Sequence, residues 1–280
     1  MNVKELLGIP PWEWPQNAGE IFLKLLVDKQ ADASDRLIAA DLAGELVVMN
    51  NQLADALLAI VAGRDEFEEL RAHAAIGLGP VLEQADTELL DDDQFDDPEA
   101  VPIDLPTFRN LQDSLRRLYL DESNPKEVRR KVLEAAVRAR QDWQPSAILD
   151  AYSSGDNDWK LTAVFAMRWV KGFDDQILEA LESPDPEIHL EAVTAAGNWQ
   201  LDAAWPHVVA LAETPSTPKP LRLAAIDAVG SIRPLEAQEI LSPLTASHDE
   251  DIAAAAEEAI AMGQAMSDDE DEESDGEWIN

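Results

Sequence analysis

Apolar positions recur along most of the chain with the spacing of a helix that buries one face. The clearest case begins at Ile188, and the apolar residues that follow it with this spacing are Ala192, Val193, Ala195 and Ala196. They lie four, five, seven and eight positions on, which forms one stripe at 3.6 residues per turn. This pattern predicts an amphipathic α-helix.

The residues around this helix predict where it starts and stops, and a second helix after it. Asp185 can cap the first turn, while Gly197 and Asn198 suit the end because both tolerate left-handed backbone geometry. Residues 201–213 form the expected second helix, with Pro206 in its first turn, where a missing N–H costs little. The unit is therefore a pair of short helices joined by a tight turn.

The pattern repeats at a nearly fixed interval. Its anchor residues are Leu70, Val128, Trp159, Ile188, Leu221 and Ile252. From Val128 onward, successive anchors are 31, 29, 33 and 31 residues apart. Such a period is the signature of a solenoid, because one helix pair cannot bury its apolar face without a neighbour. The sequence predicts an all-α fold, an α-solenoid of stacked antiparallel helix pairs.

Three features of these units resemble HEAT repeats, especially the short bacterial kind also found in phycobilisome-lyase-like proteins. They are the Pro-Asp-Pro start at 184–186, an Ala/Gly-rich first helix, and a basic residue just after the anchor, at Arg71, Arg129, Lys160 and Arg222. His189 and Ala253 depart from the basic pattern in two units. The resemblance covers roughly residues 34–263. It implies the superhelical fold and leaves the function open, because HEAT-like families include scaffolds, transport receptors, lyase subunits and a few enzymes.

The remaining segments predict the domain organisation. Residues 1–33 are expected to form an N-terminal cap that contains the segment PPWEWP, and residues 34–263 the solenoid. An acidic insertion at about 86–106 interrupts the period. It lacks the glycine of a calcium-binding loop, so no metal site is expected there. Residues 264–280 are so acidic that we expect a disordered tail.

The net charge indicates which kinds of partner the protein can bind. It is formally −36, from 57 acidic and 21 basic side chains. An acidic surface repels phosphate backbones, so direct nucleic-acid binding is not expected. It favours a protein partner with a basic surface. Solubility or adaptation of the source to salt would explain the same composition, and acidity alone is poor evidence for a partner.

Features that the sequence lacks restrict where the protein is expected to reside and which chemistry it is expected to perform. No apolar run approaches the roughly 20 residues that cross a membrane, and the N-terminus does not resemble a signal peptide. We therefore expect a cytoplasmic protein with no membrane partner, which the lack of cysteine also fits. The four histidines lie in different units, and no His-Glu dipeptide occurs, although HEAT-like hydroxylases hold iron with such pairs. We expect no enzyme activity, no metal and no cofactor.

Eight residues are candidates for protein binding. Trp12 and Trp14 either close the apolar end of the solenoid or offer an exposed aromatic peptide to a partner. Trp143 and Trp199 fall in turns between helices, where large aromatics are either core or part of an interaction surface. Second helices line the concave face in HEAT-like folds, and the acidic candidates expected there are Asp150, Glu179, Glu182 and Glu213. These carboxylates either attract a basic peptide or are simply solvated.

These observations favour a non-enzymatic protein–protein interaction scaffold or adaptor. One alternative is an acidic charge mimic or chaperone that occupies basic, nucleic-acid-binding surfaces through the insertion and the tail. The other is an enzyme subunit of the bilin-lyase type, which would act on a cysteine of another protein.

Overall fold

The computed structural model describes residues 2–90 and 101–275, with side chains in 2–87 and 101–263. Every regular element in these residues is helical, which confirms the all-α prediction. The chain divides into two compact units, Met1–Ser146 and Ala147–Asn280.

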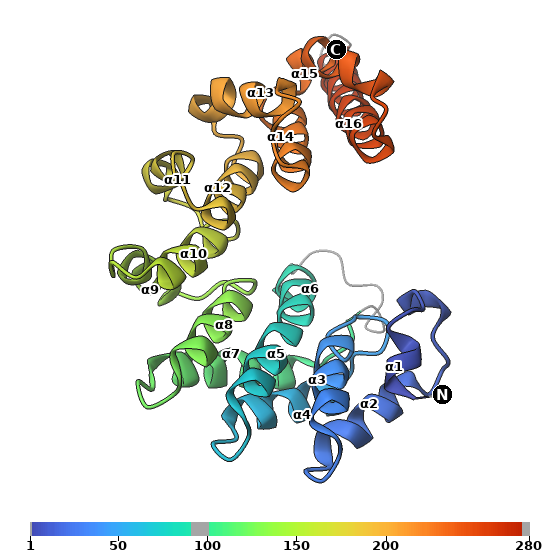
Figure 1. Ribbon diagram of the computed structural model, residues 1–280, viewed down its shortest axis with the longest axis vertical. Helices are drawn as coiled ribbons and strands as arrows, with labels where there is room; N and C mark the ends of the chain where they lie inside the picture. The colour runs from blue at the N-terminus through green and yellow to red at the C-terminus, as the bar shows by residue number, and fades with distance from the viewer. Residues whose placement is uncertain (1, 91–100, 276–280) are drawn as a thin grey trace, which may run out of the picture. The chain divides into compact units, whose positions relative to one another are not determined.

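In the described residues of unit 1, the elements are the α-helices α1 to α8 and a 3₁₀ helix, Pro11–Glu13. Its α-helices are α1 (Val3–Leu6), α2 (Ala18–Val27), α3 (Ala33–Leu42), α4 (Asn51–Ala62), α5 (Glu68–Gly77), α6 (Gly79–Leu90), α7 (Leu105–Leu120) and α8 (Lys126–Ala136). The first helices α3, α5 and α8 pack side by side in chain order, and α2, α4 and α7 form a second row against them (Figure 1).

Unit 2 repeats this plan after α9 (Gln144–Tyr152), which spans the division between the units. Its first helices are α10 (Asn157–Ala166), α12 (Pro186–Asn198), α14 (Lys219–Ile232) and α16 (Glu250–Asp275). Its second helices are α11 (Asp174–Ala180), α13 (Trp205–Glu213) and α15 (Pro234–Leu241). Each first helix packs on the next, and each second helix packs on the first helix that follows it. Neighbouring helix pairs therefore cover one another, as expected for an α-solenoid.

The apolar stripe that begins at the anchor Ile188 is buried in the core of unit 2. Ile188, Ala192, Val193, Ala195 and Ala196 are all at most 2% exposed. The carboxylate of Asp185 caps α12 as expected, because it accepts hydrogen bonds from the N–H groups of residues 187 and 188 at 3.0 and 3.4 Å.

The basic residue after the anchor has a structural role that repeats. In four repeats it is the fourth residue of a first helix, and it bonds to the penultimate carbonyl of the preceding helix. The pairs are Arg36 to Leu26 (3.0 Å), Arg71 to Val61 (2.8 Å), Arg129 to Tyr119 (2.8 Å) and Arg222 to Ala212 (2.8 Å). The last carbonyls of a helix have no donor within the helix and carry the negative end of its dipole. The arginine therefore caps one helix from the next repeat and fixes their packing.

Three segments differ from the sequence-based expectations. The first residues of the acidic insertion, 86–90, are helical rather than a loop, because they continue α6, in which Pro80 lies in the first turn and Val81, Leu82 and Ala85 are fully buried. Residues 91–100 of that insertion lie outside the described residues. PPWEWP contains a 3₁₀ turn, since Pro11 fits its first position. The expected disordered tail begins at 264, whereas α16 continues to Asp275 through a stretch without Gly or Pro.

Candidate protein-interaction surface

Two hollows in unit 1 meet along α5. The first, of about 520 Å³, is lined by Asp41, Glu68, Glu69, Ala72, His73, Ile76, Glu127 and Lys131. The second, of about 470 Å³, is lined by Pro11, Trp12, Asp41, Gly44, Glu45, Leu46, Val47, Ile76, Gly77 and Pro80. They share Asp41 and Ile76, so we treat them as one surface and call it the α5 groove.

One end of the α5 groove is apolar. Trp12 is 79% exposed, Val47 61%, Leu46 40% and Ile76 37%, and all four line the second hollow. Large apolar side chains that gather on a surface usually mark an interaction site, whereas single exposed ones do not.

The packing of two glycines produces this apolar end. A Cβ atom added to Gly44, just after α3, would lie 2.8 Å from the Cα of Gly77 at the end of α5. Only glycines let the two backbones approach this closely. The approach brings the turn that carries Leu46 and Val47 against the end of α5.

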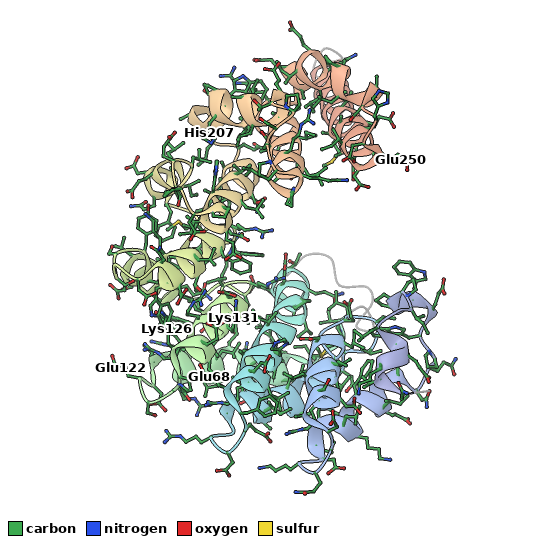
Figure 2. All side chains as sticks on the ribbon, viewed as in Figure 1. Glu68, Glu122, Lys126, Lys131, His207 and Glu250 are labelled. Atoms are coloured by element: carbon green, nitrogen blue, oxygen red, sulfur yellow. The ribbon has the colours of Figure 1, made fainter. Side chains whose placement is uncertain are left out.

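Acidic side chains line both hollows. Glu68 and Glu69, in the first turn of α5, line the first hollow, and Glu45, in the turn after α3, lines the second beside the apolar side chains. Within the described part of the chain, none of these three carboxylates forms an ion pair. The groove's one lysine, Lys131, is held by Glu134 at 2.7 Å. Figure 2 labels Glu68 on α5 and Lys131 on α8.

Two further groups complete the rim of the groove. The Asp41 carboxylate lies 2.5 Å from Nδ1 of His73. The Glu127 carboxylate pairs with Arg130 at 2.7 Å. The groove therefore combines an apolar end with a rim on which carboxylates outnumber basic groups.

The structure gives different roles to the two tryptophans of PPWEWP. The Trp14 indole N–H points at the carbonyls of Ile9 and Leu6, at 2.9 and 3.2 Å, and its ring packs edge-on against Phe22. Trp14 is thus part of the N-terminal packing. Trp12 is the exposed one and lines the groove.

Trp143 and Trp199 are half-buried and bonded within the fold. Trp143 stacks at a tilt on Tyr119, with ring centres 5.1 Å apart, and donates to the Gln141 side chain. The Trp199 indole N–H donates to the carbonyl of Met167 at 2.6 Å. Neither residue lines the α5 groove.

The four acidic candidates lie in unit 2, on or just after second helices. Asp150 is exposed in α9, and Glu213 is exposed at the end of α13. Glu179 in α11 pairs with Lys160 at 3.2 Å, and this bond, followed by one from Tyr152, lowers the pKa of the Glu179 carboxyl. Glu182 lies 3.6 Å from Nδ1 of His207. They are spread over several repeats and are not gathered into one pocket.

The position of the second helices also differs from the expectation. In unit 2 as Figure 1 shows it, α10, α12 and α14 lie on the inner side of the curved row, and α9, α11 and α13 on the outer side. The second helices of this unit therefore do not line its concave side in that view.

Two histidines that are distant in sequence come together in unit 2. Nε2 of His189 in α12 lies 2.9 Å from Nε2 of His207 in α13. Figure 2 labels His207. Burial, followed by the neighbouring His207, lowers the pKa of His189, so this ring is neutral near pH 7 and one histidine donates to the other. In residues 2–90 and 101–275, no cluster of three or more His, Asp or Glu could hold a metal ion. The helices there include none that could span a bilayer.

Sequence reasoning missed most of the α5 groove. Leu46, Val47 and Ile76 were not candidates, nor were Glu45, Glu68 and Glu69. One feature of the sequence indicated part of this surface. Gly44 ends the apolar pattern of α3, so Leu46 and Val47 fall in a turn, where few apolar side chains can be buried. The contact of that turn with α5 is not local in sequence.

Comparisons with known proteins match one part of the chain to a family of repeats and leave the function open. Residues 175–261 match the family model of HEAT repeats. Similar solved structures include human deoxyhypusine hydroxylase in complex with glycerol, at 15% identity and a TM-score of 0.42, over 94% of this chain and 88% of that one. Another is YibA of Escherichia coli, at 15% identity and a TM-score of 0.46, over 92% of this chain and 85% of that one. No curated protein matches the sequence.

Proposed function

We propose that this chain, a member of the HEAT-repeat family through residues 175–261, is a non-enzymatic scaffold that binds a protein partner. The observation that carries the proposal is the α5 groove, where four large apolar side chains stay exposed on one surface. A protein partner would cover that surface and remove it from water, which is favourable by about 25 cal/mol per Å² of apolar area. Solenoids commonly bind through such extended helical surfaces.

The experiment is to identify the partner and then measure its binding directly. The full chain is immobilised, and proteins are captured from an extract of the organism that makes it. Each purified candidate is then titrated into the chain by calorimetry. We expect at least one partner with a Kd of about 10 µM or tighter, which corresponds to roughly 7 kcal/mol.

Two results would contradict the scaffold proposal. The first is that no captured protein binds the purified chain. The second is that the purified chain turns over a substrate and a single polar substitution abolishes that turnover while the fold survives.

The charge-mimic alternative predicts a different binding surface. It requires the acidic insertion and tail, so removal of residues 268–280 would weaken partner binding, and added salt would weaken it steeply. The scaffold proposal predicts that the truncated chain keeps its affinity within about twofold, because the apolar contacts remain.

A further inference from the structure

We infer that the α5 groove binds an amphipathic helix that carries an apolar stripe flanked by lysine or arginine. This inference rests on the proposed function and names the chemistry of the partner. The occupant is a helical segment of another protein, and the apolar end, the acidic rim and the length of the groove each point to it.

The apolar end provides the anchoring contacts. Trp12 and Val47 are the most exposed of the four apolar side chains there, and Leu46 and Ile76 line the same hollow. Aromatic side chains in partly enclosed surfaces often dominate binding energy. A partner with leucine-like side chains would fill this end.

The rim selects the charge of the partner. Glu45, Glu68 and Glu69 lack ion-pair partners within the described residues, while Asp41 already pairs with His73 and Lys131 with Glu134. An incoming lysine or arginine would therefore meet unpaired carboxylates in both hollows, at Glu68 and Glu69 in the first and at Glu45 in the second. An acidic segment would meet like charge. This chain's own acidic C-terminal segment, SDDEDEESDGE, is excluded as the occupant for that reason.

The length of the groove fits a helix. The groove residues of α5 run from Glu68 to Gly77, which spans about 14 Å at 1.5 Å per residue. A partner helix with apolar residues at i, i+3, i+4 and i+7 presents a stripe of about 10 Å, which this span accommodates. In the described residues there is no β-strand whose edge could take an extended peptide instead.

The test uses a synthetic peptide of about 18 residues as the probe, with leucine at i, i+3, i+4 and i+7 and lysine beside the stripe. The peptide is labelled with fluorescein, and its anisotropy is measured as the full chain is added. Two matched peptides carry glutamate in place of lysine, or the same composition in scrambled order. We expect the lysine peptide to bind at least about tenfold more tightly than either.

Two groove variants separate the apolar from the charge contribution. The first combines Trp12→Ala with Val47→Ser, and the second combines Glu45→Gln, Glu68→Gln and Glu69→Gln. All five side chains are exposed, so both variants are expected to fold, which circular dichroism and thermal unfolding verify. Each variant should bind the lysine peptide about tenfold more weakly.

Matched control variants change the same residue types elsewhere. Val27→Ser with Leu120→Ser removes exposed apolar groups outside the groove, at 63% and 58% exposure. Asp174→Asn, Asp175→Asn and Glu239→Gln together remove three exposed carboxylates from second helices of unit 2. Both controls should bind the lysine peptide within about twofold of the wild type, because neither changes the groove.

The outcomes separate this inference from the proposed function. The inference is overturned if the control carboxylate variant loses as much affinity as the groove variant, since binding would then be general charge attraction. It is also overturned if a captured protein partner binds the groove variants as well as the wild type, and the scaffold function then stands. If no protein partner binds the chain at all, both proposals fall.

Discussion

At the scale of single residues, the repeated arginine explains why a basic side chain follows the anchor. The guanidinium of Arg71 is 4% exposed, and it donates to the carbonyl of Val61 and to the side-chain oxygen of Asn124 at 2.6 Å. One side chain therefore joins α4, α5 and the loop before α8. The planar guanidinium has several N–H donors in fixed directions, so it can bond to two acceptors at once more readily than the single ammonium group of lysine.

We predict that Arg71→Lys lowers the free energy of unfolding by about 2–3 kcal/mol, because it leaves a buried carbonyl or amide without its donor. Urea unfolding followed by circular dichroism measures the change. The matched control is Arg109→Lys on the exposed face of α7, which should change stability by less than about 0.5 kcal/mol. Equal effects of the two substitutions would show that the capping bond contributes nothing.

A second arginine gives unit 1 a pH-dependent contact. Arg36 bonds to both carboxylate oxygens of Glu66, at 2.6 and 3.0 Å, and this bond lowers the pKa of the Glu66 carboxyl from its usual 4.5. A carboxyl with a lowered folded pKa stabilises the protein above the unfolded value. That contribution is lost as the pH falls below 4.5 towards the folded pKa.

We therefore predict that Glu66→Gln destabilises the chain by about 1–2 kcal/mol at pH 7 and by much less near pH 3. The difference shrinks because protonated glutamate and glutamine have the same shape and no charge. Urea unfolding of both proteins at several pH values measures it. Glu20→Gln, an exposed carboxylate of α2, serves as the control. A difference that stays constant with pH would contradict the assignment.

At the scale of helices, small residues set how closely first helices approach. A Cβ atom added to Gly230 of α14 would lie 2.9 Å from the Cβ of Ala259 on α16. At Gly197 of α12, an added Cβ would lie 3.0 Å from the Cα of Ala228 on α14. The Ala/Gly-rich character of the first helices is thus a packing requirement of this row.

We predict that Gly230→Ala destabilises unit 2 by about 1–3 kcal/mol, because α14 and α16 must move apart. Without the close contact, replacing glycine by alanine would stabilise the helix by about 1 kcal/mol, because alanine is the better helix former. A destabilising effect therefore indicates that α14 and α16 are in close contact at this position. In an Ala259→Gly background the same substitution should be neutral or stabilising. Thermal unfolding of the four proteins in this cycle measures the coupling between the two sites. Additive effects would show that the helices do not meet there.

The sequence predicted the elements better than the groove, for a physical reason. Helices such as α12 follow from local signals, namely the apolar stripe that starts at Ile188 and the Asp185 cap. The groove depends on the contact of Gly44 with Gly77, which lies 33 residues away and leaves no periodic trace. The helix α6 was missed because the acidic residues from 86 onward predicted an insertion, whereas the buried side chains of Val81, Leu82 and Ala85 hold this segment against its neighbours as a helix.

At the scale of the whole molecule, the charge is the dominant property. A net charge of −36 on 280 residues keeps a protein soluble and opposes its compact state, because like charges repel. Only part of this charge is compensated by ion pairs, such as those of Arg36 and Lys131. Stability should therefore depend on how strongly the solvent screens the repulsion.

We predict that raising NaCl from about 0.02 M to 0.5 M increases the midpoint of thermal unfolding by several degrees, because the screening length falls from roughly 20 Å to about 4 Å. Differential scanning calorimetry measures the midpoint. KCl should give the same increase, since screening depends on ionic strength and not on the identity of the cation. The chain without residues 268–280, which lacks eight acidic side chains, should respond less to salt because less repulsion remains to be screened. A response to NaCl that KCl does not reproduce would indicate specific sodium binding instead, and a midpoint that falls with salt would show that attractive ion pairs outweigh the repulsion.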